Sequence, residues 1–134
     1  MRRPLPFLAL SAALLATAAY AAPTGCSVGL HSAKTAEIYF GRDESGAISD
    51  AEWRRFVEAE VTPRFPDRLA VADVYGQRRN PAAHFAPEPS KAVLVVLTGA
   101  PDDGQKLDLV RNAYAARFHQ DSVLQVEPQA CIAF

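Results

Sequence analysis

The chain alternates between segments with a two-residue hydrophobic period and segments with a helical period. Apolar and polar side chains alternate along residues 35–41 and again along residues 69–77, as in strands that are buried on one face. Residues 91–99 contain a continuous apolar run, which favours a central strand of a sheet. Residues 122–127 predict a last strand, and Pro128 interrupts it because proline lacks the N–H that a strand ladder needs.

Two helices are predicted between these strands. Ser49 followed by Glu52 forms a capping box, which marks the start of the first helix. This helix must weaken near Thr62, because Pro63 removes a hydrogen-bond donor and restricts the residue before it. The second helix is expected to start at residues 101–103, with acidic side chains in its first turn. The apolar stripes consist of Trp53, Phe56, Val57 and Val61 in the first helix and of Leu107, Val110, Tyr114 and Phe118 in the second.

The order strand, helix, strand, strand, helix, strand predicts an α+β protein with the ferredoxin-like β-α-β-β-α-β fold. In this topology four strands form an antiparallel sheet, and two helices pack on one face of it. The predicted single domain covers residues 34–134, and residues 22–33 are expected to form an irregular lead before it.

The first 21 residues have the three parts of a secretory signal peptide. A short basic start is followed by an apolar run over residues 5–19 and by Ala19-Tyr20-Ala21, which fits the small-x-small cleavage pattern. A transmembrane anchor is the alternative, but the run is short for a bilayer span and no charged stop signal follows it. Residues 1–21 are therefore predicted to be a signal peptide. The mature protein is expected to be periplasmic or secreted, without a membrane span.

The two cysteines of the chain, Cys26 and Cys131, lie near opposite ends of the mature sequence. Secretion permits disulfides, and the predicted topology brings the start of the first strand close to the end of the last strand. A disulfide that encloses nearly the whole domain is therefore favoured. The alternative is a lipid-modified Cys26, but residues 23–25 lack the leucine and small-residue pattern that usually precedes such a site.

Charge and composition argue against several classes of partner. Of the 14 lysines and arginines, two lie in the signal peptide, so 12 remain against 15 acidic residues, a net charge of about −3. No basic run remains, so nucleic acid is not expected as a partner. The three histidines are scattered and the cysteines are not paired in sequence, so no metal site is expected. No phosphate-binding or dinucleotide-binding loop occurs either, so no cofactor is predicted.

The sheet face opposite the helices has no predicted cover from this chain. Polar members of the strand alternations, including two tyrosines, are expected there. One interpretation is a solvated face, as many antiparallel sheets have. The other is a surface covered by a second copy of the chain or by a small-molecule ligand, with tyrosine hydroxyls and carboxylates lining the gap. The residues assigned to this face are Glu37, Tyr39, Tyr75, Gln77 and Gln125, together with Asp73 and Glu127.

Glu60 is predicted to fall inside the apolar stripe of the first helix, where a carboxylate has to be paired or protonated. Arg64 lies four residues on, at the usual spacing for an ion pair on a helix. A structural pair that locks the helix exit is favoured over a catalytic role, because single buried pairs are more often structural. Arg64, Arg79 and Lys91 are also candidates for binding an anion.

Several stretches resemble a bacterial family of small exported proteins, the domain-of-unknown-function family 3574. The most specific stretch is the "W…F…EVTPRFPD-L" core followed by "YGQ-R", and the resemblance spans nearly the whole mature chain. It implies an exported, compact α+β domain and assigns no reaction. The family pattern carries glycine where Arg68 stands and often tryptophan at Arg78, so Arg78 receives no shared role. The matching stretches are residues 36–42, 49–80, 90–97, 113–126 and 131–134.

Two classes of function remain open. The first is a periplasmic domain without enzymatic activity that self-associates as a homodimer, or binds a small ligand, through the open sheet face. The second is a small cofactor-independent enzyme acting on a small organic substrate, since ferredoxin-like domains often pair their sheets into a dimeric barrel around a pocket. In that case Glu37, Tyr39 and Tyr75 would line the pocket, and Arg64 or Lys91 would hold an anionic group. The first class is favoured, because the sequence shows no acid and base that are held close together.

Overall fold

The computed structural model describes residues 25–42, 48–79 and 85–134 of the chain. The predicted signal peptide, residues 1–21, lies outside the described residues. In chain order the elements are β1 (His31–Gly41), α1 (Asp50–Phe56), the π-helical turn η1 (Val57–Val61), β2 (Leu69–Arg79), β3 (Phe85–Val96), α2 (Asp103–Phe118), β4 (Leu124–Val126) and β5 (Gln129–Ile132).

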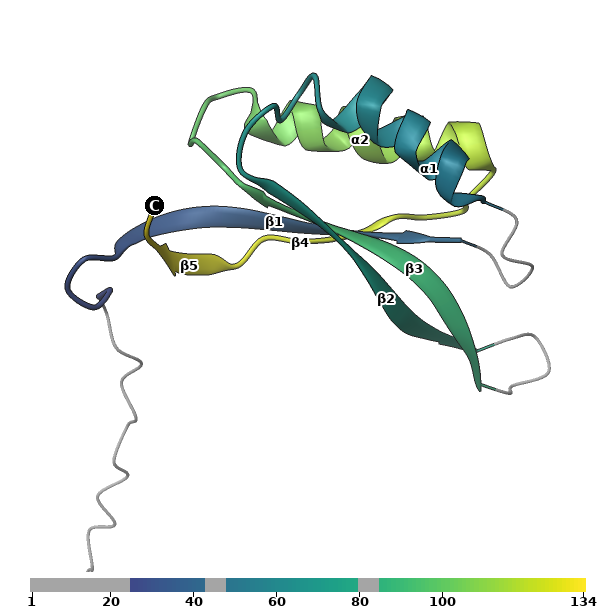
Figure 1. The fold of residues 1–134 in the computed structure, drawn as a ribbon, viewed down its shortest axis with the longest axis horizontal. Coiled ribbons are helices and arrows are strands. Elements are labelled where there is room, and N and C mark those ends of the chain that lie inside the picture. The colour runs from purple at the N-terminus through teal and green to yellow at the C-terminus, as the bar shows by residue number, and fades with distance from the viewer. Residues whose placement is uncertain (1–24, 43–47, 80–84) are drawn as a thin grey trace, which may run out of the picture.

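The strands form an antiparallel sheet in the order β2-β3-β1-β4, and β5 pairs with the beginning of β1. Helices α1 and α2 both lie on one face of this sheet, and no other described helix covers the opposite face (Figure 1). This arrangement confirms the predicted ferredoxin-like α+β fold. Beyond the helices, residues 74–79 of β2 and residues 85–90 of β3 continue as a twisted two-stranded ribbon, here called the β2–β3 arm (Figure 1).

The two ends of the domain are more regular than the sequence predicts. Strand β1 begins at His31, so the last three residues of the expected irregular lead are extended and pair with β5. Strand β5 was not predicted, because Pro128 interrupts the last predicted strand and pairing resumes directly after it. Since β5 lies beside the start of β1, Cys26 and Cys131 meet with a Cα–Cα distance of 5.5 Å and form the predicted disulfide.

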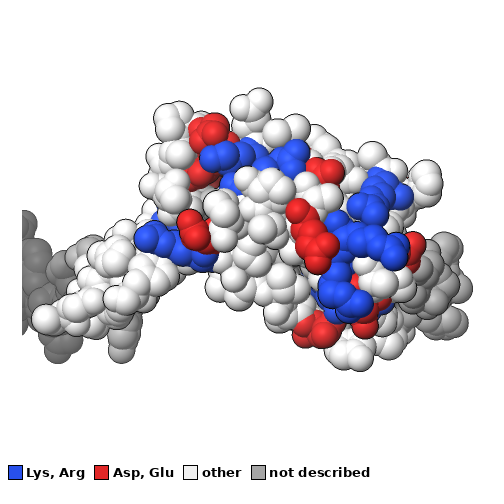
Figure 2. Space-filling view, turned by 45° about the horizontal axis from the view of Figure 1, so that its top comes forward, with Lys and Arg blue, Asp and Glu red and all other residues white. Residues whose placement is uncertain are grey.

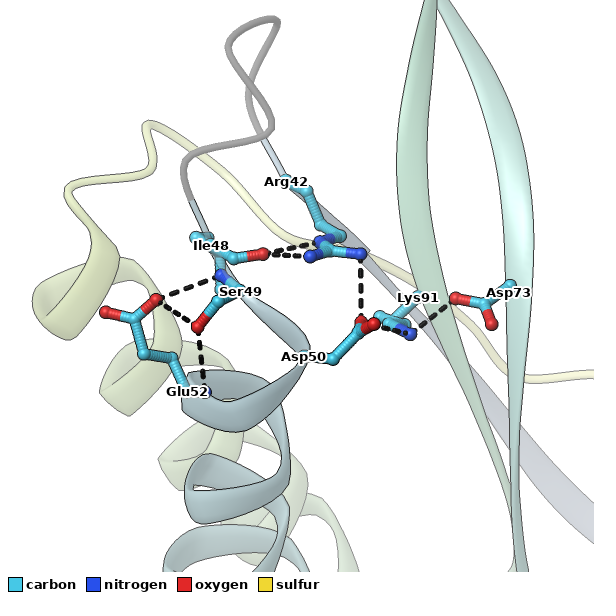
Figure 3. Close-up of polar contacts among 7 residues, drawn as sticks. All are labelled: Arg42, Ile48, Ser49, Asp50, Glu52, Asp73 and Lys91. Carbon is cyan, nitrogen blue, oxygen red and sulfur yellow. Dashed lines mark hydrogen bonds and ion pairs between the residues drawn. The ribbon is translucent and has the colours of Figure 1, made fainter.

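The first helix begins at the predicted capping box. The Ser49 side chain accepts a hydrogen bond from the Glu52 backbone N–H, and the Glu52 carboxylate accepts one from the Ser49 backbone N–H (Figure 3). After Phe56 the helix widens into η1, where the Thr62 N–H donates to the Val57 carbonyl at 2.8 Å. Pro63 follows directly, so the helix ends where the sequence predicts.

The hydrophobic core lies between the helices and the sheet, and aromatic rings form its centre. Phe40 of β1 is fully buried, with ring centroids 5.1, 5.8 and 4.7 Å from those of Trp53, Phe56 and Tyr114. Phe118 of α2 packs against the edge of this cluster. Both predicted apolar stripes therefore face the sheet, and their edge-to-face contacts add to the stability gained from burial.

Lysines and arginines are interspersed with aspartates and glutamates on the helix-bearing side of the molecule (Figure 2). A surface on which both signs of charge are interspersed is typical of contact with solvent. In the part of the chain that the structure describes, no helix is long and apolar enough to cross a bilayer. Because the helix-bearing side has this mixed, solvent-exposed surface, a binding site is expected on the uncovered sheet face.

Candidate functional site

The open face of the sheet is more apolar than the sequence analysis predicts. Glu37 and Tyr39 lie on it as expected, opposite apolar positions of both neighbouring strands. The side chains of Leu94, Leu124 and Val126 share this face and are 40%, 61% and 44% exposed. Apolar side chains gathered on an uncovered face are typical of a surface that binds a ligand or another protein chain.

Four of the seven residues predicted for the open face, Asp73 among them, lie on the other face. Gln125 is opposite the buried Ile38, and Tyr75 and Gln77 share the face of β2 that lies beside the buried Val93. The prediction was wrong because it assigned polar side chains to the open face. In β2, apolar residues occur at odd and even positions alike, so polarity does not identify the faces of this strand. In β4 the polar residue points toward the helix side, and its two apolar neighbours point to the open face. The buried Oε1 of Gln125 has no hydrogen-bond partner among the described residues.

A cleft of about 510 Å³, here called the open-face cleft, opens where the β2–β3 arm meets the end of β1 and the connection between α2 and β4. Four separate segments of the chain contribute to it, and residues from both faces of the arm line it. Tyr75 and Gln77 therefore line the cleft even though they do not lie on the open face. The lining residues are Tyr39, Gly41, Val74, Tyr75, Gly76, Gln77, Glu88, Ser90, His119, Gln120, Asp121, Ser122 and Leu124.

Gly41 allows the two sides of the cleft to approach each other closely. A Cβ atom at this position would lie 2.7 Å from Oε1 of Glu88, so any larger residue would displace that carboxylate. On the helix side, the Tyr114 hydroxyl donates a hydrogen bond to the Gly41 carbonyl at 2.7 Å. Burial raises the pKa of Tyr114, so its hydroxyl remains a donor at neutral pH. The floor of the cleft is thus tied to the aromatic core.

The Tyr39 hydroxyl donates a 2.5 Å hydrogen bond to the carboxylate of Glu37. This hydrogen bond raises the pKa of Tyr39, because deprotonation would place a phenolate beside a carboxylate. The hydroxyl therefore keeps its proton at neutral pH. Its oxygen lone pairs remain able to accept a hydrogen bond from a ligand.

The connection between α2 and β4 supplies cleft residues that the sequence analysis missed. Helix α2 ends at Phe118, and the capping residue His119 has a left-handed φ of 53° that turns the chain toward β4. Residues 119–122 then line the cleft beside the end of β1. The predicted topology contained this signal, because β4 pairs with β1 and the segment before β4 must reach that end of the sheet.

Lys91, a predicted anion-binding candidate, binds carboxylates of the chain itself (Figure 3). Its side chain is only 9% exposed, and its Nζ lies 3.1 Å from Asp50 and 2.5 Å from Asp73. The hydrogen bond to Asp73 raises the pKa of Lys91, so the ammonium group stays charged. Arg42 binds the same Asp50 at 3.1 Å and also donates to the Ile48 carbonyl. This network ties β2 and β3 to the start of α1 and does not line the cleft.

The predicted Glu60–Arg64 ion pair is present, with 2.9 Å between Oε2 and Nη1. The same Nη1 donates to the Glu60 carbonyl at 2.6 Å. The Glu60 side chain is 31% exposed, so its expected position inside the apolar stripe was wrong. The widened turn of η1 shifts its residues relative to α-helical spacing, which moves Glu60 to the rim of the stripe. The pair lies at the helix exit, away from the open-face cleft.

The charged side chains of the cleft differ from those expected. Glu88 and Asp121 line it, whereas no lysine or arginine from the described part of the chain does. The suggestion that Arg64 or Lys91 holds an anionic group in a pocket of this face is therefore wrong. The side chain of Arg79 lies outside the described part of the structure. No described histidine, cysteine, aspartate and glutamate side chains group in a way that could hold a metal ion.

A comparison with family models classifies the sequence. Residues 35–134 match the model described as "Protein of unknown function (DUF3574)". The chain belongs to the DUF3574 family. No curated protein matches its sequence.

Two solved structures share the fold of this DUF3574 chain. A phage SAM lyase in complex with S-methyl-5'-thioadenosine has a TM-score of 0.54 and 15% identity, over 85% of this chain and 97% of the lyase chain. A phage SAM lyase in the apo state has a TM-score of 0.56 and 14% identity, over 77% of this chain and 90% of the lyase chain. At these identities the similarity concerns the fold alone.

Proposed function

We propose that this protein is an exported domain that binds a small neutral or cationic organic molecule in the open-face cleft. The cleft itself carries the proposal. Its volume of about 510 Å³ falls within the roughly 300 to 1,000 Å³ typical of small-molecule sites. Export is supported by the signal-peptide pattern of residues 1–21 and by the Cys26–Cys131 disulfide, since disulfides persist in oxidising compartments such as the periplasm.

The chemistry of the lining supports this class of ligand. Two carboxylates and no described lysine or arginine face the cleft, so an anion would be repelled. The rings of Tyr39 and Tyr75 suit a flat group or a cation. A nucleoside combines a flat base with hydroxyl groups, and the phage SAM lyase of similar fold was solved with S-methyl-5'-thioadenosine. Nucleosides and their positively charged derivatives are therefore the first compounds to test.

A binding role is favoured over the alternative, a small enzyme of dimeric-barrel type. The raised pKa values of Tyr39 and Lys91 keep both groups protonated at neutral pH, so neither is prepared to remove a proton from a substrate. Lys91 also lies outside the cleft.

Replacing Tyr75 with alanine, or Glu88 with glutamine, is expected to weaken ligand binding by about 5- to 30-fold. The first change removes a stacking surface and the second removes a carboxylate, and either contact contributes about 1 to 2 kcal/mol. Because Tyr75 is 80% exposed, the melting temperature should change little. A thermal-shift screen of nucleosides, S-methyl-5'-thioadenosine and quaternary ammonium compounds selects the ligand, and calorimetry then measures its affinity.

Leu109→Ala is the matched control, because Leu109 lies on α2 with 46% of its surface exposed and does not line the cleft. This variant should bind like the wild type. Wild-type affinity in both cleft variants would show that the selected ligand binds elsewhere and would refute the proposed site.

The apolar open face also supports self-association of two copies. Strand β2 is an edge strand of 11 residues, and none of its described side chains is buried. A long edge strand with unpaired backbone groups readily pairs with another chain. A second copy packed on the open face of the sheet would cover Leu94, Leu124 and Val126 and would close the cleft.

Leu124→Asp is expected to shift a wild-type dimer to a monomer, because it places a charge within the apolar face. Analytical ultracentrifugation over a concentration series measures the change. Leu109→Asp introduces the same charge on the helix-bearing side and should leave the dimer intact. A wild-type protein that sediments as a monomer at every concentration would rule out this association.

A further inference from the structure

A second cavity lies at the other end of the sheet, where β1 begins and β3 ends. Its volume is about 350 Å³, and residues 31–34, residues 96–99, Arg68 and Ile132 line it. The open-face cleft, in contrast, adjoins Gly41 at the end of β1 and Ser90 in the middle of β3. The two cavities share no residue, so the second one is a separate candidate site.

The polar side chains that line this second cavity are positively charged or neutral. Lys34 and Arg68 bring two cations, and His31 and Thr98 add further hydrogen-bonding groups. None of the described lining residues is an aspartate or a glutamate. The charge of this site is therefore opposite to that of the open-face cleft, although the protein as a whole is slightly acidic.

The two cations are also available to a ligand. Neither the Lys34 nor the Arg68 side chain makes a hydrogen bond or an ion pair with another described residue. In the adjoining cavity of about 270 Å³, Arg64 is already paired with Glu60 and Lys106 with Asp102. The unsatisfied positive charge at this end of the molecule is thus concentrated at Lys34 and Arg68.

Arg68 is held in an unusual backbone conformation. Its φ is 63°, a left-handed value that is uncommon for a long side chain. The Val96 N–H donates to the Arg68 carbonyl at 3.1 Å, which holds the residue at the edge of β3. The guanidinium lies over the Phe134 ring, 4.4 Å from its centroid. Stacking of this kind orients the flat guanidinium while its N–H groups remain free to bind in plane.

We propose that this second cavity binds a small organic anion, a carboxylate or phosphate group attached to an apolar body. Lys34 and Arg68 bind the anionic group, since a guanidinium matches the paired oxygens of both groups. The apolar body lies against Val96, Leu97 and Ile132, which form the non-polar part of the lining. Backbone strain at Arg68 is consistent with this role, because strained residues cluster where ligands bind.

The test is an NMR titration of the oxidised protein at low ionic strength with inorganic phosphate, acetate and hexanoate. The expected result is a set of shifted backbone amides in residues 31–34 and 96–99, with hexanoate binding more tightly than acetate. No shift at these residues with any of the three anions would overturn the proposal. Equal affinities for acetate and hexanoate would overturn the apolar part of the site.

Arg68→Gly is the decisive variant, because glycine adopts a positive φ without strain and should keep or raise the melting temperature. Anion affinity should nevertheless fall by at least about tenfold. Lys34→Gln should weaken binding in the same direction, whereas Lys106→Gln, which removes an already paired cation, should leave it within about twofold. Wild-type affinity in both Arg68→Gly and Lys34→Gln would contradict the assignment.

This inference is independent of the proposed function of the open-face cleft. Tyr75→Ala should bind the anions as the wild type does, and Arg68→Gly should bind the cleft ligand as the wild type does. Failure of one site therefore leaves the other in place.

Discussion

Replacing both Cys26 and Cys131 with serine should lower the free energy of unfolding by about 4 to 5 kcal/mol. The disulfide joins residues that are 105 positions apart, so in the unfolded chain it restricts almost the whole domain. It also ties the segment before β1 to β5, which is a short strand with little buried surface. Chemical denaturation of the oxidised wild type and of the double variant measures the difference.

Reduction of the wild-type protein provides the control for this prediction. The reduced protein should show the same loss of stability as the double serine variant, because both lack the same constraint. A loss below about 1 kcal/mol in both samples would show that the unfolded chain gains little freedom when the bond is absent.

Phe40→Ala should cost about 3 to 5 kcal/mol, which is the range for removing a fully buried phenylalanine ring. Phe40 is 0% exposed, and its ring contacts Trp53, Phe56 and Tyr114 at the junction of the sheet with both helices. The cavity left behind would border all three rings, which lose their contacts with Phe40. Thermal and urea unfolding of the variant measure the loss.

Two further variants make the Phe40 measurement specific. Phe40→Leu retains most of the apolar volume and should cost clearly less than Phe40→Ala. Leu109→Ala removes a leucine that is 46% exposed on α2 and should stay within about 0.5 kcal/mol of the wild type. Similar losses in Phe40→Ala and Leu109→Ala would contradict the placement of the core.

Much of the fold could be predicted because local signals agreed with one topology. The Ser49–Glu52 capping box, the stop at Pro63 and the stripe on α2 each predict an element that the structure contains. The topology in turn brings both cysteines together, and the disulfide confirms that pairing. These signals depend on short-range backbone chemistry and on helical periodicity, which a single sequence contains directly.

The faces of the strands were harder to predict because burial depends on partners that lie far away in the sequence. Tyr75 extends from the β2–β3 arm, beyond the cover of the helices, so a polar or apolar residue there carries little information about its face. Gln125 faces the helix side although its neighbours Leu124 and Val126 are apolar. Glu60 was misplaced because a π-helical turn breaks the spacing on which a helical wheel relies.

The candidate sites were partly visible in the sequence. Glu37 and Tyr39 were assigned to the correct face, because β1 alternates cleanly between buried and partly exposed residues. The contributions of Gly41 and of residues 119–122 depend on how α2 leads into β4, and no local motif indicates this. The cavity around Arg68 joins four segments that are distant in the sequence, so only the folded chain reveals the concentration of positive charge.

A crystal structure of the oxidised protein with the compound that stabilises it most in the thermal-shift screen tests the central claim most directly. We expect electron density for this compound in the open-face cleft, in contact with Tyr39, Tyr75 and Glu88. Density for the compound only outside the cleft, or a cleft filled by the protein's own side chains, would contradict ligand binding at this site.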